Sequence, residues 1–430
     1  MHGTRAGRFI LEWRRPAAAV LAVLCLFSFG YAGGSRSSTG GPRPGDEVGY
    51  FTTRHPVRTP YEVLLACQLP SGAFTLKPGD SRIIPYFANL AAMALVDRRP
   101  QAVRLYVEWY LDRLNLPDRW GLHGTIYDYR VDPSGKEEPT HGYDSADSYA
   151  ATFLTLVRAY LDRTGDLDFV LDKLPALETV AGVIPALQDA DGLVWATPAR
   201  FEKYLMDNCE NYRGLVDYAA ILAAVGRDEE AGRALAAAGR VRRGIEERLW
   251  NEKRGNYDWC IYTLWLGGLR LGEVSRKSDW KRWYPDTTAQ IFPVITGVID
   301  PGSPRAASLY QNLDQWHPGW VGQAKADPHP WSVLGYAAAV MGDTQQALAF
   351  TRATAATYMA EDGPYSGLSW EIAWHLLTVG LLVGHDVPQA AGGPSLKALE
   401  ETGPDVTTVS ASGAPEPGDP SDPPAPRPAR

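Results

Sequence analysis

A helical hairpin that recurs along the chain is the feature that most constrains its fold. Five times an apolar stretch with helical spacing runs into a short polar turn and then into a second helical stretch. Clear copies begin at Ala91, Thr152, Asp217 and Leu334. A repeated hairpin buries its apolar face only by stacking on its neighbours, so copies spread along the chain predict a solenoid or a closed ring of helices.

The two ends of the chain differ in composition from the hairpin region. Arginines precede a short apolar run that begins at Ala17, and small residues follow it, which predicts an export signal or an uncleaved signal anchor over residues 1–33. Residues 34–54 are rich in Gly, Ser and Pro and predict a flexible linker. Residues 388–430 are rich in Pro, Ala and Gly and predict a tail without a core. We therefore expect a hairpin domain over residues 55–387 that is exported to the periplasm, the cell surface or the medium.

Charge and cysteine content exclude several classes of function. The chain carries 50 acidic and 42 basic residues, and nucleic-acid binding depends on clustered Lys and Arg that neutralise phosphates, so we expect no nucleic-acid partner. Three cysteines follow the predicted signal, Cys67, Cys209 and Cys260, and their spacing is not typical of a zinc site. We expect buried free thiols at these positions, with a Cys209–Cys260 disulfide as the alternative in an oxidising compartment.

The connections between the predicted helices alternate in length. Twelve helices are expected to begin near Pro60, Pro85, Pro100, Ser145, Asp166, Glu210, Asp228, Pro285, Ser303, Trp331, Asp343 and Ser369. The long connections cover residues 69–84, 115–143, 188–209, 250–284, 313–330 and 360–368. Because the helices of hairpins run alternately up and down, all long connections leave the same end, which is where function concentrates in helical arrays. If the first and last helices pair, six hairpins close a ring around one pocket. The segment that begins at Trp259 fits a strand or a further helix.

Acidic and aromatic residues recur where the long connections enter the next helix. Examples are YDSADSY from Tyr143, MDNCENY from Met206, YPDTT from Tyr284, DPHPW from Asp327, EDGPYSGLSWE from Glu361, and the stretch Pro85-Tyr86-Phe87. Glycosidic cleavage needs two carboxyl groups across a groove, one protonated and one ionised. Aromatic rings offer flat apolar faces to sugars.

Helix capping is the competing interpretation of these acids. Asp207 with Glu210, and Asp144 with Asp147, stand three residues apart at helix starts, where side chains cap free backbone amides. Glu371 suits the positive end of a helix dipole. Capping does not explain why aromatic residues gather at the same end; these are Tyr143, Tyr149, Tyr212, Trp331 and Trp370, together with His329.

Two segments carry a resemblance to a known superfamily. LMDNCENYRGLVDYAAILAA from Leu205 is similar to the glucoamylase-type segment in which an L-W-E-E stretch precedes a Gly and an apolar helix, and YMAEDGPYSGLSWEIAWHLLTVGLL from Tyr358 resembles the final segment of that family. With the helix order over residues 55–385, the chain resembles the six-hairpin glycosidases. The resemblance implies an all-α (α/α)6 toroid and a glycoside hydrolase with Glu210 as general acid, Glu361 as general base, and no metal or redox cofactor.

The resemblance also implies roles for other acids of this end. Asp144, Asp147, Asp207 and Glu371 would hold sugar hydroxyls, and Trp331 would stack on a sugar ring. The stretch YDSADSYAATFL instead resembles the paired-Asp helix start of the family 8 endoglucanases, which would give Asp147 a catalytic role. Both assignments stay open.

Two other functions fit the same fold. A polysaccharide lyase or sugar epimerase would work through His and Tyr, and His123, His141 and His329 fall on the long connections. A catalytically inactive glycan-binding or scaffold protein would grip a carbohydrate through the aromatic groove, tethered to a membrane by the N-terminal apolar segment. The sugar and the linkage are not predicted.

Overall fold

Helices make up most of the chain that the computed structural model describes, namely residues 59–384 apart from 267, 326 and 360–364. All of these residues belong to one compact unit. The predicted signal, linker and tail lie outside the described residues, and so does Glu361. None of the described helices is both long and apolar enough to cross a bilayer.

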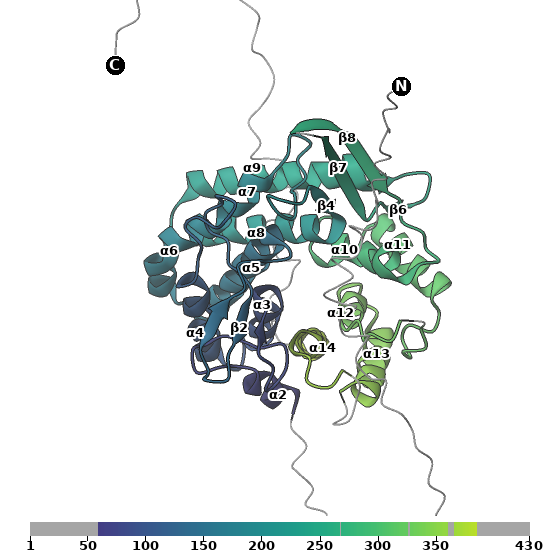
Figure 1. Cartoon of the computed structure of the whole chain (residues 1–430). Coiled ribbons are helices and arrows are strands. Elements are labelled where there is room, and N and C mark those ends of the chain that lie inside the picture. Colours follow the sequence, from purple (N-terminus) through teal and green to yellow (C-terminus); the bar gives the residue numbers. More distant parts are fainter. Residues whose placement is uncertain (1–58, 267, 326, 360–364, 385–430) are drawn as a thin grey trace, which may run out of the picture. The chain divides into compact units, whose positions relative to one another are not determined.

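Six helices form an inner ring. They are α3 (Pro85–Met93), α5 (Ala146–Thr164), α8 (Leu205–Ala224), α10 (Phe292–Ile295), α12 (Val333–Val340) and α14 (Ser369–Leu382). Each contacts the next in this order, and α14 contacts α3. Figure 1 shows the result, with the purple α3 beside the yellow-green α14. The inner layer is therefore closed.

A second set of helices covers the inner ring. Its members are α2 (Pro60–Ala66), α4 (Pro100–Leu111), α6 (Leu167–Ala181), α7 (Val183–Leu187), α9 (Asp228–Gly244), α11 (Pro304–Trp316) and α13 (Thr344–Thr357). The first of these, α2, packs against the last inner helix, α14. This contact between opposite ends of the described chain completes the sixth hairpin, and the predicted (α/α)6 toroid is confirmed.

Local signals explain most helix starts. Thr59 forms a capping box with Glu62 at α2, and the side chains of Asp166, Ser303 and Asp343 cap α6, α11 and α13. Proline occupies the first turn of α2, α3, α4 and α11. Gly165 ends α5 in the left-handed conformation, with φ 66°.

Two predicted helix starts were wrong in position. Helix α8 begins at Leu205, five residues before Glu210, because strand β4 (Glu202–Tyr204) runs directly into it without a side-chain cap or proline to mark the start. The stretch after Tyr284 forms a π-helical turn, η2 (Trp283–Thr287), and a 3-10 turn, η3 (Thr288–Ile291), before α10.

Short antiparallel sheets occupy the long connections. One contains β1 (Arg82–Ile83), β2 (Tyr129–Val131) and β3 (Glu137–Pro139); the second has the order β4, β7 (Cys260–Leu266), β8 (Leu269–Arg276); the third pairs β5 (Trp250–Asn251) with β6 (Asn256–Tyr257). The ambiguous segment after Trp259 is thus a strand. Lys203 of β4 lies opposite Ile261 of β7.

A buried lysine ties the second sheet to the turn after α7. Lys203 Nζ donates to Asp189 Oδ2 at 2.6 Å, Asp191 Oδ2 at 2.8 Å and Glu273 Oε1 at 2.7 Å, and its side chain is fully buried. Within the described residues these three acids are the one group with spacing suited to a metal ion. The ammonium group of Lys203 occupies the place between them. The three described cysteines are buried free thiols, as expected.

Candidate active site

The ends of the inner helices that follow the long connections are joined by side-chain contacts. Tyr86, in the first turn of α3, donates its hydroxyl proton to Glu210 Oε1 of α8 at 2.6 Å, across 124 residues of sequence. The neighbouring Phe87 stacks on Trp370 of α14, with ring centroids 4.3 Å apart. Three inner helices therefore meet through four side chains.

The contacts continue around the ring toward α12 and η2. The rings of Trp370 and His329 lie 6.4 Å apart, and His329 Nε2 is 2.7 Å from Glu371 Oε1. Trp331, two residues before α12, packs against Tyr284 of η2 at 4.8 Å. Eight residues thus take part in the contacts at this end of the ring: Tyr86, Phe87, Glu210, Tyr284, His329, Trp331, Trp370 and Glu371.

Two acids on adjacent helices share one serine hydroxyl. Ser145 Oγ lies 2.7 Å from Asp147 Oδ1 of α5 and 2.7 Å from Asp207 Oδ2 of α8. Asn211 Nδ2 donates to the other oxygen of Asp147 at 2.7 Å. Asp147 is fully buried, whereas Asp207 is partly exposed. The structure thus brings together two predicted site acids from segments 60 residues apart.

Burial changes the acidity of these carboxyl groups. It raises the pKa of Glu210 from 4.5 to about 8, although hydrogen bonds from Tyr86 and Ser148 act in the opposite direction. Burial also raises the pKa of Asp147 to about 6, and it raises the pKa of Asp207 well above its ordinary value, with the charges of Asp147 and Glu210 adding to the effect. A carboxyl group with a pKa near 8 carries its proton at neutral pH.

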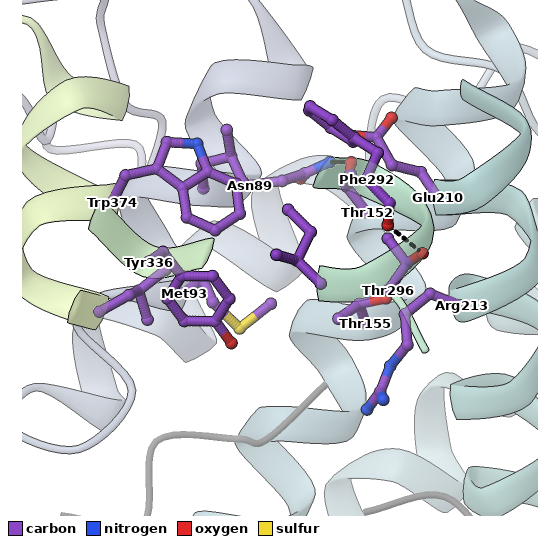
Figure 2. A pocket seen from close by; sticks show the side chains of 13 residues that line it. Asn89, Met93, Thr152, Thr155, Glu210, Arg213, Phe292, Thr296, Tyr336 and Trp374 are labelled. Atoms are coloured by element: carbon purple, nitrogen blue, oxygen red, sulfur yellow. Dashed lines mark hydrogen bonds between the residues drawn. The ribbon is translucent and has the colours of Figure 1, made fainter. Parts of the chain in front are cut away.

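A cavity inside the ring explains why Glu210 is buried and yet not packed in solid core. All six inner helices line it, and its volume is about 100 Å³. Figure 2 shows Glu210 and Phe292 on one side and Trp374 and Tyr336 on the other. The lining residues are Asn89, Leu90, Met93, Thr152, Thr155, Glu210, Arg213, Phe292, Ile295, Thr296, Tyr336, Trp374 and Leu377. Most of this lining is apolar, and the apolar surroundings stabilise the neutral form of Glu210.

Glu371 differs from Glu210 in its surroundings. Its Oε1 faces His329 Nε2 and its Oε2 accepts from the backbone N–H of Ser332 at 2.8 Å. Burial acts to raise the pKa of Glu371, but the contacts with His329 and Ser332 outweigh it and hold this pKa below its usual value. Both oxygens are therefore engaged, and the carboxyl group is ionised at neutral pH.

The remaining predicted residues have well-defined places. Asp144 pairs with Arg200 at 2.8 Å and keeps about a third of its side chain exposed (31%). Trp331 is 9% exposed, has a φ of 58°, and donates Nε1–H to Asp327 Oδ2 at 3.2 Å. A positive φ at a tryptophan is strained, and the contacts of Trp331 with Asp327 and Tyr284 hold it.

Sequence reasoning missed several residues of this end. Tyr86 was noted only as an aromatic residue at a helix start, and Ser145 and Asn211 were not singled out, although both flank predicted acids. Asp128, on the connection before α5, accepts a hydrogen bond from the Tyr149 hydroxyl at 2.9 Å, and burial raises its pKa to about 7. Its sequence surroundings contain no signal for this environment.

Comparison with known proteins places the fold. No protein-family model matches the sequence, and no curated protein matches it significantly. Among solved structures, a wild-type glycosidase is similar at 15% identity and a TM-score of 0.55, over 75% of this chain and 95% of that one.

Two further solved structures agree with that comparison. The GH63 mannosylglycerate hydrolase of Thermus thermophilus is similar at 14% identity and a TM-score of 0.52, over 74% of this chain and 98% of that one. A bacterial glucoamylase complexed with acarbose is similar at 13% identity and a TM-score of 0.53, over 77% of this chain and 56% of that one. The chain therefore has the (α/α)6 toroid fold of the six-hairpin glycosidases.

Proposed function

We propose that the protein is a glycoside hydrolase that cleaves O-glycosyl bonds of an oligosaccharide or polysaccharide. The observation that carries this proposal is Glu210, a carboxyl group that faces a cavity in the ring and whose pKa is raised to about 8. A group that is protonated at neutral pH and reachable from a cavity can act as a general acid. The fold supports the proposal by analogy, since function depends on the site and not on the fold.

Glu210 would donate its proton to the glycosidic oxygen. The O–H bond of Glu210 breaks as a new O–H bond forms on the leaving sugar, and Glu210 is left as a carboxylate. Tyr86 already donates a hydrogen bond to Oε1, and such a bond is stronger to a carboxylate than to a neutral acid. Tyr86 would therefore stabilise the product state of this proton transfer and orient Glu210.

The general base is assigned to Glu361, which lies outside the described residues. Glu371 is the described acid nearest to Glu361 in sequence, but both oxygens of Glu371 are engaged and its side chain is buried. We assign Glu371 to positioning, because it holds the turn from His329 to Ser332 against α14. The base would activate a water molecule for attack on the anomeric carbon.

Sugar contacts are assigned to the more accessible residues near the starts of the inner helices, which are not among the residues that line the cavity. Asp144 and Asp207 are partly exposed and would accept hydrogen bonds from sugar hydroxyls. Asp147 is fully buried and would support Asp207 instead of touching the substrate. The paired rings of Tyr284 and Trp331 would offer an apolar face to a sugar ring.

The test is hydrolysis of a panel of oligosaccharides and polysaccharides by the purified full chain, read as new reducing ends. Glu210→Gln is expected to lower kcat by about 10²- to 10⁴-fold, the usual contribution of a general acid, while the fold is kept. Glu229→Gln is the matched control, because Glu229 is almost fully exposed on α9 and is expected to leave activity unchanged.

Retained activity in Glu210→Gln would remove that residue from the role of acid. Binding of a glycan by the wild type without any hydrolysis across the panel would favour the inactive binding protein. Products that carry an unsaturated sugar at the new non-reducing end, where hydrolysis would leave a saturated one, would favour a lyase.

We also propose that the protein is exported, on the strength of the N-terminal apolar run in the sequence. Cell fractionation of the full chain tests this, with removal of residues 1–33 as the comparison. Recovery of the full chain with soluble cytoplasmic proteins would contradict the proposal. Recovery with membranes would indicate an uncleaved anchor.

A further inference from the structure

Ser145 makes two contacts that one hydroxyl proton does not satisfy. Its Oγ is 2.7 Å from Asp147 Oδ1 and 2.7 Å from Asp207 Oδ2. A serine hydroxyl has a single proton to donate, so at any moment it donates to one of these carboxyl groups. The second contact needs a proton of its own, because two oxygens without a proton between them repel at this distance. The three groups therefore share two protons, one from the serine and one from a carboxyl group.

The surroundings decide which carboxyl group keeps its proton. Both acids lie in the first turn of a helix, Asp147 in α5 and Asp207 in α8. Asp147 in addition accepts from Asn211 Nδ2 and from backbone N–H groups, which stabilise its ionised form. Asp207 has a different set of neighbours. The charges of Asp147 and Asp144, and that of Glu210 once it ionises, disfavour a charge on Asp207. Its other titratable neighbours are Tyr86 of α3, Tyr204 of β4, Cys209 of α8 and Cys260 of β7, which are neutral at neutral pH because burial raises their pKa values.

Arg200, the cation that pairs with Asp144 just before α5, is engaged by that residue. Arg200 donates to Asp144, both to its carboxylate at 2.8 Å and to its backbone oxygen. Asp147 is thus the ionised end of the arrangement and Asp207 the protonated end. Burial and the charges of Asp147 and Glu210 raise the pKa of Asp207 well above its ordinary value, and these causes favour the protonated form of Asp207.

We propose that Ser145 is a positioning residue of the hydrolytic site: its Oγ accepts a hydrogen bond from the protonated carboxyl group of Asp207, its hydroxyl donates a hydrogen bond to Asp147, and Asp207 is thereby kept neutral beside Glu210. No covalent bond changes in this role. The proton of a neutral Asp207 is engaged by Ser145, so Asp207 offers a sugar hydroxyl only an acceptor oxygen, and it adds no charge next to Glu210 when Glu210 loses its proton. The link to hydrolysis rests on the proposed function, whereas the hydrogen-bond order does not.

The test is a titration of the full chain labelled with ¹³C at the aspartate carboxyl carbons and followed by NMR, with Asp147→Asn and Asp207→Asn to assign the two signals. In the wild type, Asp207 is expected to be protonated and Asp147 ionised at neutral pH. Ser145→Ala removes the acceptor of one proton and the donor of the other. It should lower the apparent pKa of Asp207 and raise that of Asp147, each by about one pH unit, a tenfold change in acid strength.

Two controls make the result specific. Ser145→Thr keeps the hydroxyl and is expected to restore the wild-type titration, which a loss of packing alone would not explain. Ser308→Ala removes an exposed serine on α11 and is expected to change neither signal.

Ionised forms of both Asp147 and Asp207 at neutral pH in the wild type would overturn the proposal. An unchanged titration in folded Ser145→Ala would also overturn it. If Ser145→Ala does not fold, the wild-type titration still decides which carboxyl group is protonated. The titration needs no substrate. A failure of the hydrolysis panel would therefore contradict the proposed function and leave the titration result valid, and a failed titration would leave the hydrolysis result valid.

Discussion

The hydroxyl of Tyr86 donates a 2.6 Å hydrogen bond to Glu210 Oε1, joining helices α3 and α8 at the mouth of the ring. This bond lowers the pKa of Glu210, while burial raises it to about 8. The acidity of Glu210 is thus a balance between burial, which raises its pKa, and the hydrogen bonds from Tyr86 and Ser148, which lower it.

Tyr86→Phe tests this balance. Removal of the hydroxyl is expected to raise the pKa of Glu210, because the bond favours its ionised form, and so to move the alkaline limit of activity to higher pH. It should also lower kcat about tenfold, the equivalent of one hydrogen bond of about 1.4 kcal/mol. Tyr61→Phe on α2 is the control and should change neither value. An unchanged pH profile in Tyr86→Phe would show that the bond does not set the acidity.

Glu210 should make the protein less stable at alkaline pH. Its folded pKa, about 8, lies above its ordinary value of 4.5, so the folded state binds a proton that the unfolded state releases. The resulting stabilisation is complete below pH 4.5 and is lost as the pH rises to about 8, at about 1.4 kcal/mol per pH unit.

Glu210→Gln removes this titration. The variant is therefore expected to gain stability relative to the wild type as the pH rises from 5 to 9, and the gain should level off above about pH 8. Chemical denaturation at several pH values measures the difference. Parallel stability curves for the two proteins would contradict a raised pKa at Glu210, whether or not the residue is catalytic.

Glu371 should behave in the opposite way. Its pKa is held below the ordinary value of 4.5 by His329 and Ser332, so its contribution to stability is present above pH 4.5 and is lost as the pH falls through its folded pKa. Glu371→Gln is expected to lower the free energy of unfolding by about 2 kcal/mol at neutral pH, since it weakens two buried hydrogen bonds. The loss should shrink in acid.

Glu108→Gln is the matched control for that variant. Glu108 pairs with Arg104 on the surface of α4, and exposed pairs contribute about 0–1 kcal/mol. A loss of stability in Glu371→Gln that is no larger than in this control would show that the turn before α12 does not depend on Glu371.

Lys203→Met tests the buried charge cluster at the second sheet. The variant leaves Asp189, Asp191 and Glu273 close together without their shared ammonium group. Loss of one partner from a buried ion pair typically costs about 3–5 kcal/mol, and thermal unfolding should show it. Lys136→Met, in an exposed pair with Glu138, is the control and should change stability by less than about 1 kcal/mol.

The effect of calcium on the melting temperature is a second test of the Lys203→Met prediction. The three carboxylates of the Lys203→Met variant have spacing suited to a cation, so added calcium is expected to raise the melting temperature of the variant and to leave the wild type unchanged. A variant that melts like the wild type without calcium would show that Arg248 and Arg270, which also pair with these acids, neutralise them without Lys203.

Sequence alone was sufficient for the parts of the fold that depend on neighbouring residues. The caps at Thr59 and Ser303, the first-turn prolines at Pro85 and Pro100, and the helical spacing of apolar residues act within a turn or two, so they predicted helices and their order. The alternation of short and long connections then predicted a ring with one loop-rich end. The start of α8 at Leu205 escaped this reasoning, because a strand and not a capping side chain precedes it.

The site required the tertiary structure, because its contacts join segments that are distant in sequence. Closure of the ring brings Tyr86 to Glu210 and places Ser145 between Asp147 and Asp207. The sequence could name Glu210 as an acid, but its pKa depends on the apolar side chains that six helices contribute around one cavity. Residue types and local patterns determine which groups are present, whereas burial and distance determine which of them hold a proton.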